Sequence, residues 1–194
     1  RMRKLVFLAT AACMFATPAL AQNATGTVVI NGSVANKCAV ITGSGTSATW
    51  GTTVNLGELS QSNGTLRSTA SLTNDFNTVA AGAQNAQVVC STSNPSIAID
   101  ADPLVNTGNV PGAGSGYTNT VHFDADVTVN KVGGSQTYTN DSNTAATGPT
   151  ALGDRLAASG PNVLIATSNW RTPGSGALLV SGSYQGQIVV TITP

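Results

Sequence analysis

Hydrophobic and polar residues alternate in several short segments of this chain, and residues 120–129 show the pattern most clearly. Every second position there is apolar, through Val121, Phe123, Ala125, Val127 and Val129. Successive side chains of a β-strand point to opposite faces, so this period of two predicts a strand with one face in the core. The polar positions between them predict a second face that meets solvent.

Similar alternation, or short apolar runs, predicts more strands with turn-forming residues between them. These strands are expected at residues 24–34, 38–41, 54–59, 87–90, 96–100, 163–166, 177–180 and 184–193. The pattern is loose between 60 and 84, where a strand or helical turn is expected only near 72–79. A Gly/Pro-rich loop is expected at 102–116, and a hairpin with loops at 132–161. Short strands separated by turns predict an all-β fold, either an immunoglobulin-like β-sandwich or another β-sandwich.

The first residues predict a secretory signal peptide at 1–21. Basic residues at positions 1–4 precede an apolar run from Leu5 to Ala16, and the small-residue triplet Ala19-Leu20-Ala21 follows. The apolar run is short for a membrane span, so a membrane anchor is the weaker alternative. Cleavage after Ala21 is expected to leave residues 22–194, a length typical of one domain.

Charge argues against two classes of partner. Asp and Glu together equal Lys and Arg in number, eight of each in the whole chain. The predicted signal peptide contains three of the basic residues and none of the acidic ones, so the remaining chain is net acidic. Nucleic acid and anionic membranes are therefore not expected as partners. Charged residues make up only 8% of the chain, which also disfavours long solvated helices.

Cysteine usage predicts one disulfide. Cys13 lies in the predicted signal peptide, which leaves Cys38 and Cys90 in an exported chain. A bridge across that loop is worth about 4 kcal/mol on the chain-entropy model. Free thiols or half of a metal site are the alternatives, weakened because the chain has one histidine.

Two acidic groups of residues are candidate metal sites. His122, Asp124 and Asp126 share one strand face, where they are either metal ligands or, in the better reading, the solvent face of the strand. Asp100 and Asp102 share a face at a predicted strand end, where they are either cation ligands or the polar groups of a turn.

Other chemistry is poorly represented. No Gly-x-Ser-x-Gly segment is present, and the Gly-rich segments lack a following Gly-Lys-Ser/Thr. The sequence thus predicts neither an enzyme nor a cofactor. Four aromatic residues are candidates for sugar stacking, although scattered aromatics are more often core or loop anchors. They are Trp50, Trp170, Tyr117 and Tyr138.

The two ends of the chain and its cysteines resemble the spore coat protein U domain family, which includes pilin subunits of archaic chaperone-usher pili. The resemblance combines the predicted signal peptide, the alternating segment after it, one cysteine soon afterwards and a second in Val88-Val89-Cys90. The chain also closes on a Gly-x-Tyr segment followed by alternating apolar residues. These positions are Gly182, Tyr184, Ile188, Val190 and Ile192.

The resemblance implies an incomplete sandwich at 37–194 and a donor strand at 22–36. In such pilins the N-terminal segment of the next subunit fills the gap by β-augmentation. The donor residues implied here are Ala24, Gly26, Val28, Ile30, Gly32 and Val34, and the groove is expected beside Tyr184, Ile188, Val190 and Ile192. The implied partners are identical or related pilin subunits, a periplasmic chaperone and an outer-membrane usher. The implied location is a cell-surface pilus serving adhesion or biofilm formation.

Two alternatives remain open from the residues alone. Residues 24–34 can instead be the first strand of a complete, self-contained sandwich, because alternation does not distinguish the two arrangements. A secreted adhesive or carbohydrate-binding module accounts for the same composition.

Overall fold

A computed structural model of the chain describes residues 26–108 and 116–194. The chain divides into two units, residues 1–33 and 34–194. The predicted signal peptide at 1–21, Cys13 and the donor position Ala24 lie outside the described residues. Within the described ranges, no helix is long and apolar enough to cross a membrane.

The described part of the first unit, residues 26–33, is exposed and forms neither helix nor strand. The strand expected at 24–34 is therefore wrong for these residues in the isolated chain. A lone strand has no ladder partner for its backbone groups, so alternation by itself does not hold it in a sheet.

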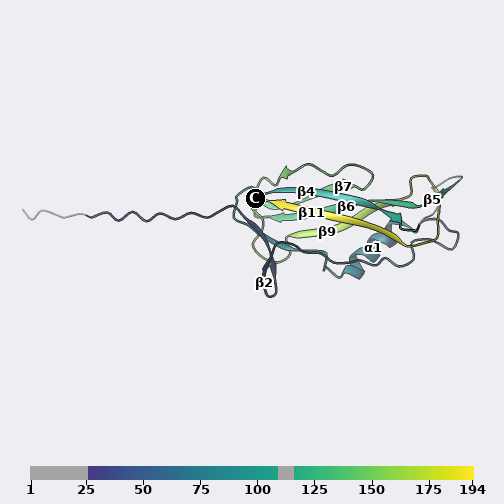
Figure 1. Cartoon of the computed structure of the whole chain (residues 1–194), viewed down its shortest axis with the longest axis horizontal. Coiled ribbons are helices and arrows are strands. Elements are labelled where there is room, and N and C mark those ends of the chain that lie inside the picture. The colour runs from purple at the N-terminus through teal and green to yellow at the C-terminus, as the bar shows by residue number, and fades with distance from the viewer. Residues whose placement is uncertain (1–25, 109–115) are drawn as a thin grey trace, which may run out of the picture. The chain divides into compact units, whose positions relative to one another are not determined.

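The regular elements of the second unit are strands, apart from one helix (Figure 1). Its elements are β1 (Cys38–Thr42), β2 (Gly45–Ser47), α1 (Thr69–Ala80), β3 (Gln87–Cys90), β4 (Ser96–Asn106), β5 (Tyr117–Thr118), β6 (Thr120–Lys131), β7 (Gly134–Asp141), β8 (Thr150–Ala151), β9 (Val163–Arg171), β10 (Leu178–Leu179) and β11 (Tyr184–Thr193). The predicted all-β, sandwich-like class is confirmed.

Strand β6 connects the two halves of the main sheet. Its first residues, Thr120 and Val121, pair with β4, which pairs in turn with β11. Its later residues pair with β7 on one edge and with β9 on the other, all antiparallel. The sheets curl into a half-barrel, and smaller pairings join β2-β1-β3 and β10-β5.

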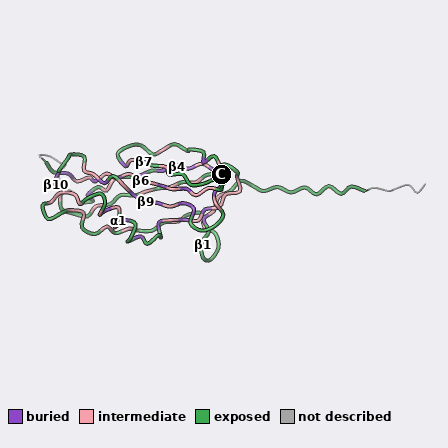
Figure 2. Tube along the Cα trace, turned by 180° about the vertical axis from the view of Figure 1, so that it is seen from behind, coloured by how far each residue is buried: buried purple, intermediate pink, exposed green. Residues whose placement is uncertain are grey.

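The core lies on the apolar face predicted for β6. All five of its predicted members are buried, and Phe123, the most exposed of them, is only 3% exposed. Ile97 and Ile99 of β4 and Val163 of β9 are buried in the same core. In Figure 2, buried stretches lie along β4, β6 and β9.

Helix α1 resolves the loose pattern near 72–79 in favour of a helix. The side chain of Ser68 caps its first turn by accepting a hydrogen bond from the Ser71 amide, and Ala81 ends it in the left-handed conformation. Leu72, Phe76 and Ala80 follow one another at intervals of four residues and are buried. Their burial on one helix face holds α1 against the strands.

Three predictions about strands and their boundaries are wrong. Residues 54–59 form no strand, and the nearest pairing is an isolated bridge between Ser60 and Leu66. The run at 177–180 contributes only the short β10. Strand β4 continues to Asn106, so the predicted loop starts too early and Asp100 and Asp102 lie within the strand.

Candidate functional site

A groove of about 630 Å³ runs along strand β11 of the second unit. One wall is residues 186–192 of β11, and the other is the segment 48–56, which follows β2. The floor carries side chains from α1, β4, β6, β9 and the residue Gln84. They are Phe76, Gln84, Leu104, Phe123, Ile165, Thr167 and Trp170.

The wall formed by β11 has a free edge. Among the described residues β11 pairs with β4 alone, from Tyr184 opposite Asn106 to Thr193 opposite Ser96. Ile188, Val190 and Ile192 are half-buried and pack against the core, while Val189 between them is 44% exposed. The backbone groups on the free edge are available to another strand.

The opposite wall is a segment without a ladder. No backbone amide or carbonyl of residues 50–56 has a hydrogen-bond partner among the described residues. Val54 and Leu56 nonetheless pack against the core, whereas Asn55 between them is exposed. The groove therefore lies between two chain segments that present unpaired backbone groups.

A β-bulge in β9 shapes the floor. The register against β6 shifts between His122 and Asp124, and Asn169 has φ of +49°. The extra residue turns Trp170 into the interior, where its ring lies 4.8 Å from that of Phe123, centroid to centroid. The Trp170 carbonyl accepts a hydrogen bond from Thr69 of α1 at 3.0 Å, which anchors the bulge.

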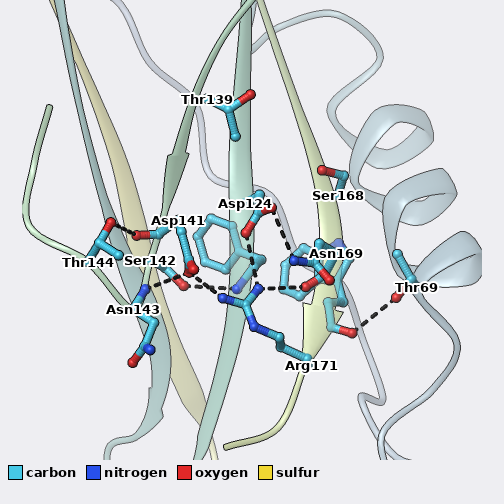
Figure 3. Close-up of polar contacts among 12 residues, drawn as sticks. Thr69, Asp124, Thr139, Asp141, Ser142, Asn143, Thr144, Ser168, Asn169 and Arg171 are labelled. Carbon is cyan, nitrogen blue, oxygen red and sulfur yellow. Dashed lines mark hydrogen bonds and ion pairs between the residues drawn. The ribbon is translucent and has the colours of Figure 1, made fainter.

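The same bulge places Arg171 on the outer face of the sheet, where it joins a polar network (Figure 3). The guanidinium pairs with Asp124 at 3.1 Å and also with Asp141. Asp126 accepts hydrogen bonds from Thr139 and Ser168 at 2.6 and 2.5 Å. The predicted polar face of β6 is thus half-buried and cross-linked by hydrogen bonds.

The polar network around Arg171 argues against a metal site formed by His122, Asp124 and Asp126. The carboxylates of Asp124 and Asp126 are already engaged by Arg171 and by neighbouring hydroxyl groups. Burial, and secondarily the Arg171 charge, lowers the pKa of His122. Within the part of the chain that the structure describes, no group of three His, Cys, Asp or Glu side chains is arranged for a metal ion.

Acid should weaken this network. The Asn143 amide, followed by Arg171, holds the pKa of the Asp141 carboxyl below its usual range. A pKa lower in the folded than in the unfolded chain means that the carboxylate stabilises the fold at neutral pH and loses that effect as pH falls through the folded-state pKa. At neutral pH, Asp141→Asn should therefore lower the free energy of unfolding, measured by denaturant titration. The loss should be no more than about 1 kcal/mol, because solvent screens the ion pair between Asp141 and Arg171. The difference in unfolding free energy between the parent and Asp141→Asn should disappear in strong acid. A difference that grows on acidification would contradict this account.

The other residues that the sequence analysis singled out do not form one common site. Of the four aromatic residues, Trp50 and Trp170 line the groove, whereas Tyr117 and Tyr138 do not. Asp102 accepts a hydrogen bond from Gln187 of β11 at 2.7 Å instead of facing a turn. Cys38 and Cys90 form the predicted disulfide, directly opposite each other in the β1-β3 ladder.

Gly186 occupies a bulge of β11 that leaves no room for a side chain. The register against β4 shifts between Gln185 and Gln187, and a Cβ at position 186 would lie 2.7 to 2.9 Å from backbone atoms of residues 102–104. Gly186→Ala should destabilise the fold by about 1 to 3 kcal/mol, measured by denaturant unfolding. Gly148→Ala is the matched control because a Cβ there meets nothing within 4 Å. Equal stability of the two variants would show that the bulge adapts freely.

Comparison with protein-family models, with curated proteins and with solved structures finds no match to this chain.

Proposed function

We propose that this chain is a structural subunit of a surface pilus, assembled by donor-strand complementation through a chaperone-usher pathway and serving adhesion or biofilm formation. The observation that carries the proposal is the groove between two unpaired walls, β11 and residues 50–56. A single inserted strand would supply ladder partners to both walls at once.

The chain carries a segment suited to be that strand. Val28, Ile30 and Val34 are 86%, 91% and 79% exposed, although each is an apolar side chain. They lie an even number of positions apart, so one face of an extended segment would present all three to a groove, while Val29 would lie on the other face together with Asn31. Burying each would contribute about 1.5 to 3 kcal/mol before ordering costs.

The N-terminal segment of a second copy is long enough to fill the groove along β11. Seven groove-lining residues of β11, 186–192, span about 23 Å at about 3.3 Å per residue. The nine residues from Gly26 to Val34 are long enough to cover that wall. An unfilled groove with a free strand edge promotes aggregation, so a periplasmic chaperone would have to cover it until assembly.

The test is whether the exported chain from Gln22 onward forms SDS-resistant multimers. Unboiled samples should give a ladder on gels that boiling collapses to one band. A chain that stays monomeric at all concentrations contradicts the proposal, and glycan binding by that folded monomer would favour the adhesive-module alternative.

A further inference from the structure

The chain contains two Asn-Gly pairs, and the structure holds them in different ways. Asn31-Gly32 lies in the exposed segment before β1, and Asn63-Gly64 lies in the loop before α1. Both asparagines are exposed to solvent. An asparagine before glycine is prone to lose its side-chain amide, because glycine has no Cβ to obstruct attack by its own backbone nitrogen. The surrounding hydrogen bonds therefore decide whether either pair reacts.

Hydrogen bonds hold Asn63-Gly64 in place. The Gly64 amide, whose nitrogen would be the nucleophile, donates to the Gln61 carbonyl at 2.9 Å. Asn63 Oδ1 accepts from the amide and the hydroxyl of Thr65, at 3.1 and 2.7 Å. The Gly64 carbonyl accepts from the Leu179 amide at 2.9 Å, which ties this turn to β10. Several hydrogen bonds must break before the Gly64 nitrogen can attack the Asn63 side chain.

Asn31-Gly32 has none of these restraints. Neither residue belongs to a helix or strand, and neither makes a hydrogen bond to another described residue. A Cβ placed on Gly32 would meet nothing within 4 Å. Nothing in the described chain therefore opposes the backbone rotation that brings the Gly32 nitrogen to the Asn31 side chain.

We propose that Asn31 is a site of spontaneous deamidation in the unassembled chain. The Gly32 amide nitrogen gives its proton to solvent and bonds to Asn31 Cγ. The bond from Cγ to the side-chain nitrogen breaks, and that nitrogen takes up a proton from solvent and leaves as ammonia. Water then opens the resulting succinimide ring at either carbonyl, which leaves aspartate or isoaspartate at position 31.

Isoaspartate would prevent strand insertion, a consequence that rests on the proposed function. The main chain of isoaspartate runs through the former side chain, so one extra methylene separates Ile30 from Val34. These two side chains then lose the spacing that places alternate positions on one face of a strand. In an inserted strand the ladder would hold the Gly32 backbone extended and oppose the reaction. Deamidation would therefore inactivate waiting subunits and spare assembled ones.

The first test follows both asparagines in one folded sample of the chain from Gln22 onward, kept dilute and monomeric in mildly alkaline buffer. Trypsin cuts after Lys37 and Arg67, so the two pairs fall in different peptides of the reduced digest. Mass spectrometry, with chromatographic separation of isoaspartate, measures both rates. Asn31 should deamidate at least about tenfold faster than Asn63, the factor that corresponds to breaking about one hydrogen bond.

Denaturant provides the control for the two rates. Unfolding removes the hydrogen bonds around Gly64, so the rates at Asn31 and Asn63 should converge. Equal rates in the folded chain would overturn the inference. Rates that stay equally far apart in denaturant would also overturn it, because the fold would then not be the cause.

The second test compares fresh and aged chains on unboiled gels. An aged parent chain should lose SDS-resistant multimers in proportion to its isoaspartate content. Asn31→Gln should keep them after the same ageing, because the longer glutamine side chain cyclises far more slowly. Fresh Asn31→Asp carries the charge of deamidation without the extra methylene, and it should assemble almost as the parent does.

The outcomes separate this inference from the proposed function. Aged parent chains that assemble as well as fresh ones would overturn the effect of deamidation on assembly while upholding the pilus proposal. Failure of the fresh chain to form multimers would overturn the proposed function. The rates at Asn31 and Asn63 would still decide whether Asn31 is the modification site.

Discussion

Replacing Ile30 by aspartate is expected to abolish SDS-resistant multimers while leaving the folded domain intact. Ile30 is 91% exposed in the isolated chain, so the change costs the monomer nothing in packing. In an assembled pilus the same position would place a carboxylate in an apolar groove without a counter-charge, which is strongly unfavourable. Gel analysis of unboiled samples, with circular dichroism as the folding check, measures both effects.

Asn31→Asp is the matched control for that experiment. It adds the same carboxylate one residue away, on the opposite face of an extended segment. It should therefore assemble almost as the parent does. If Ile30→Asp assembles as well as Asn31→Asp, the face that carries Val28, Ile30 and Val34 does not enter the groove.

Loss of the disulfide is expected to produce the largest change in monomer stability. Cys38 and Cys90 join adjacent strands across 52 residues of sequence. Closing a loop of this size stabilises by about 4 kcal/mol through the unfolded chain. A Cys38→Ala/Cys90→Ala chain should unfold at much lower denaturant than the oxidised parent.

Reductant provides the control for the disulfide. It should lower the unfolding midpoint of the parent and leave that of the double variant unchanged. Coincident unfolding curves for the oxidised parent and the double variant would show that the bridge adds no stability.

Local periodicity predicted strands where the alternating segment has at least one neighbouring strand to pair with, as β11 has in β4 and β3 has in β1. Strand β6 is the clearest example, since its alternating face is buried as expected between β7 and β9. Residues 54–59 alternate too, yet they form no strand, because pairing depends on a neighbour and no described segment lies beside them in a ladder. Alternation reports which face is buried, and hydrogen-bond partners decide whether a strand forms.

The groove floor could not be predicted from the sequence. Trp170 enters the interior only because the bulge at Asn169 shifts the register of β9 against β6. The local sequence pattern does not predict such a shift. Gln84 and Thr167 are polar residues of a kind abundant in the chain, and their burial depends on distant contacts. The half-buried network around Arg171 was missed for the same reason, although its acidic members on β6 were recognised as one face.

Amide hydrogen exchange in monomer and multimer tests the central claim most directly. The account predicts that amides of residues 50–56 and of the free edge of β11 exchange rapidly in the monomer and become protected in the multimer, because an inserted strand pairs with them. Strand β7, which pairs with β6 alone among the described residues, serves as the internal control and should not change. Protection that appears along β7 while residues 50–56 remain unprotected would contradict donor-strand insertion into this groove.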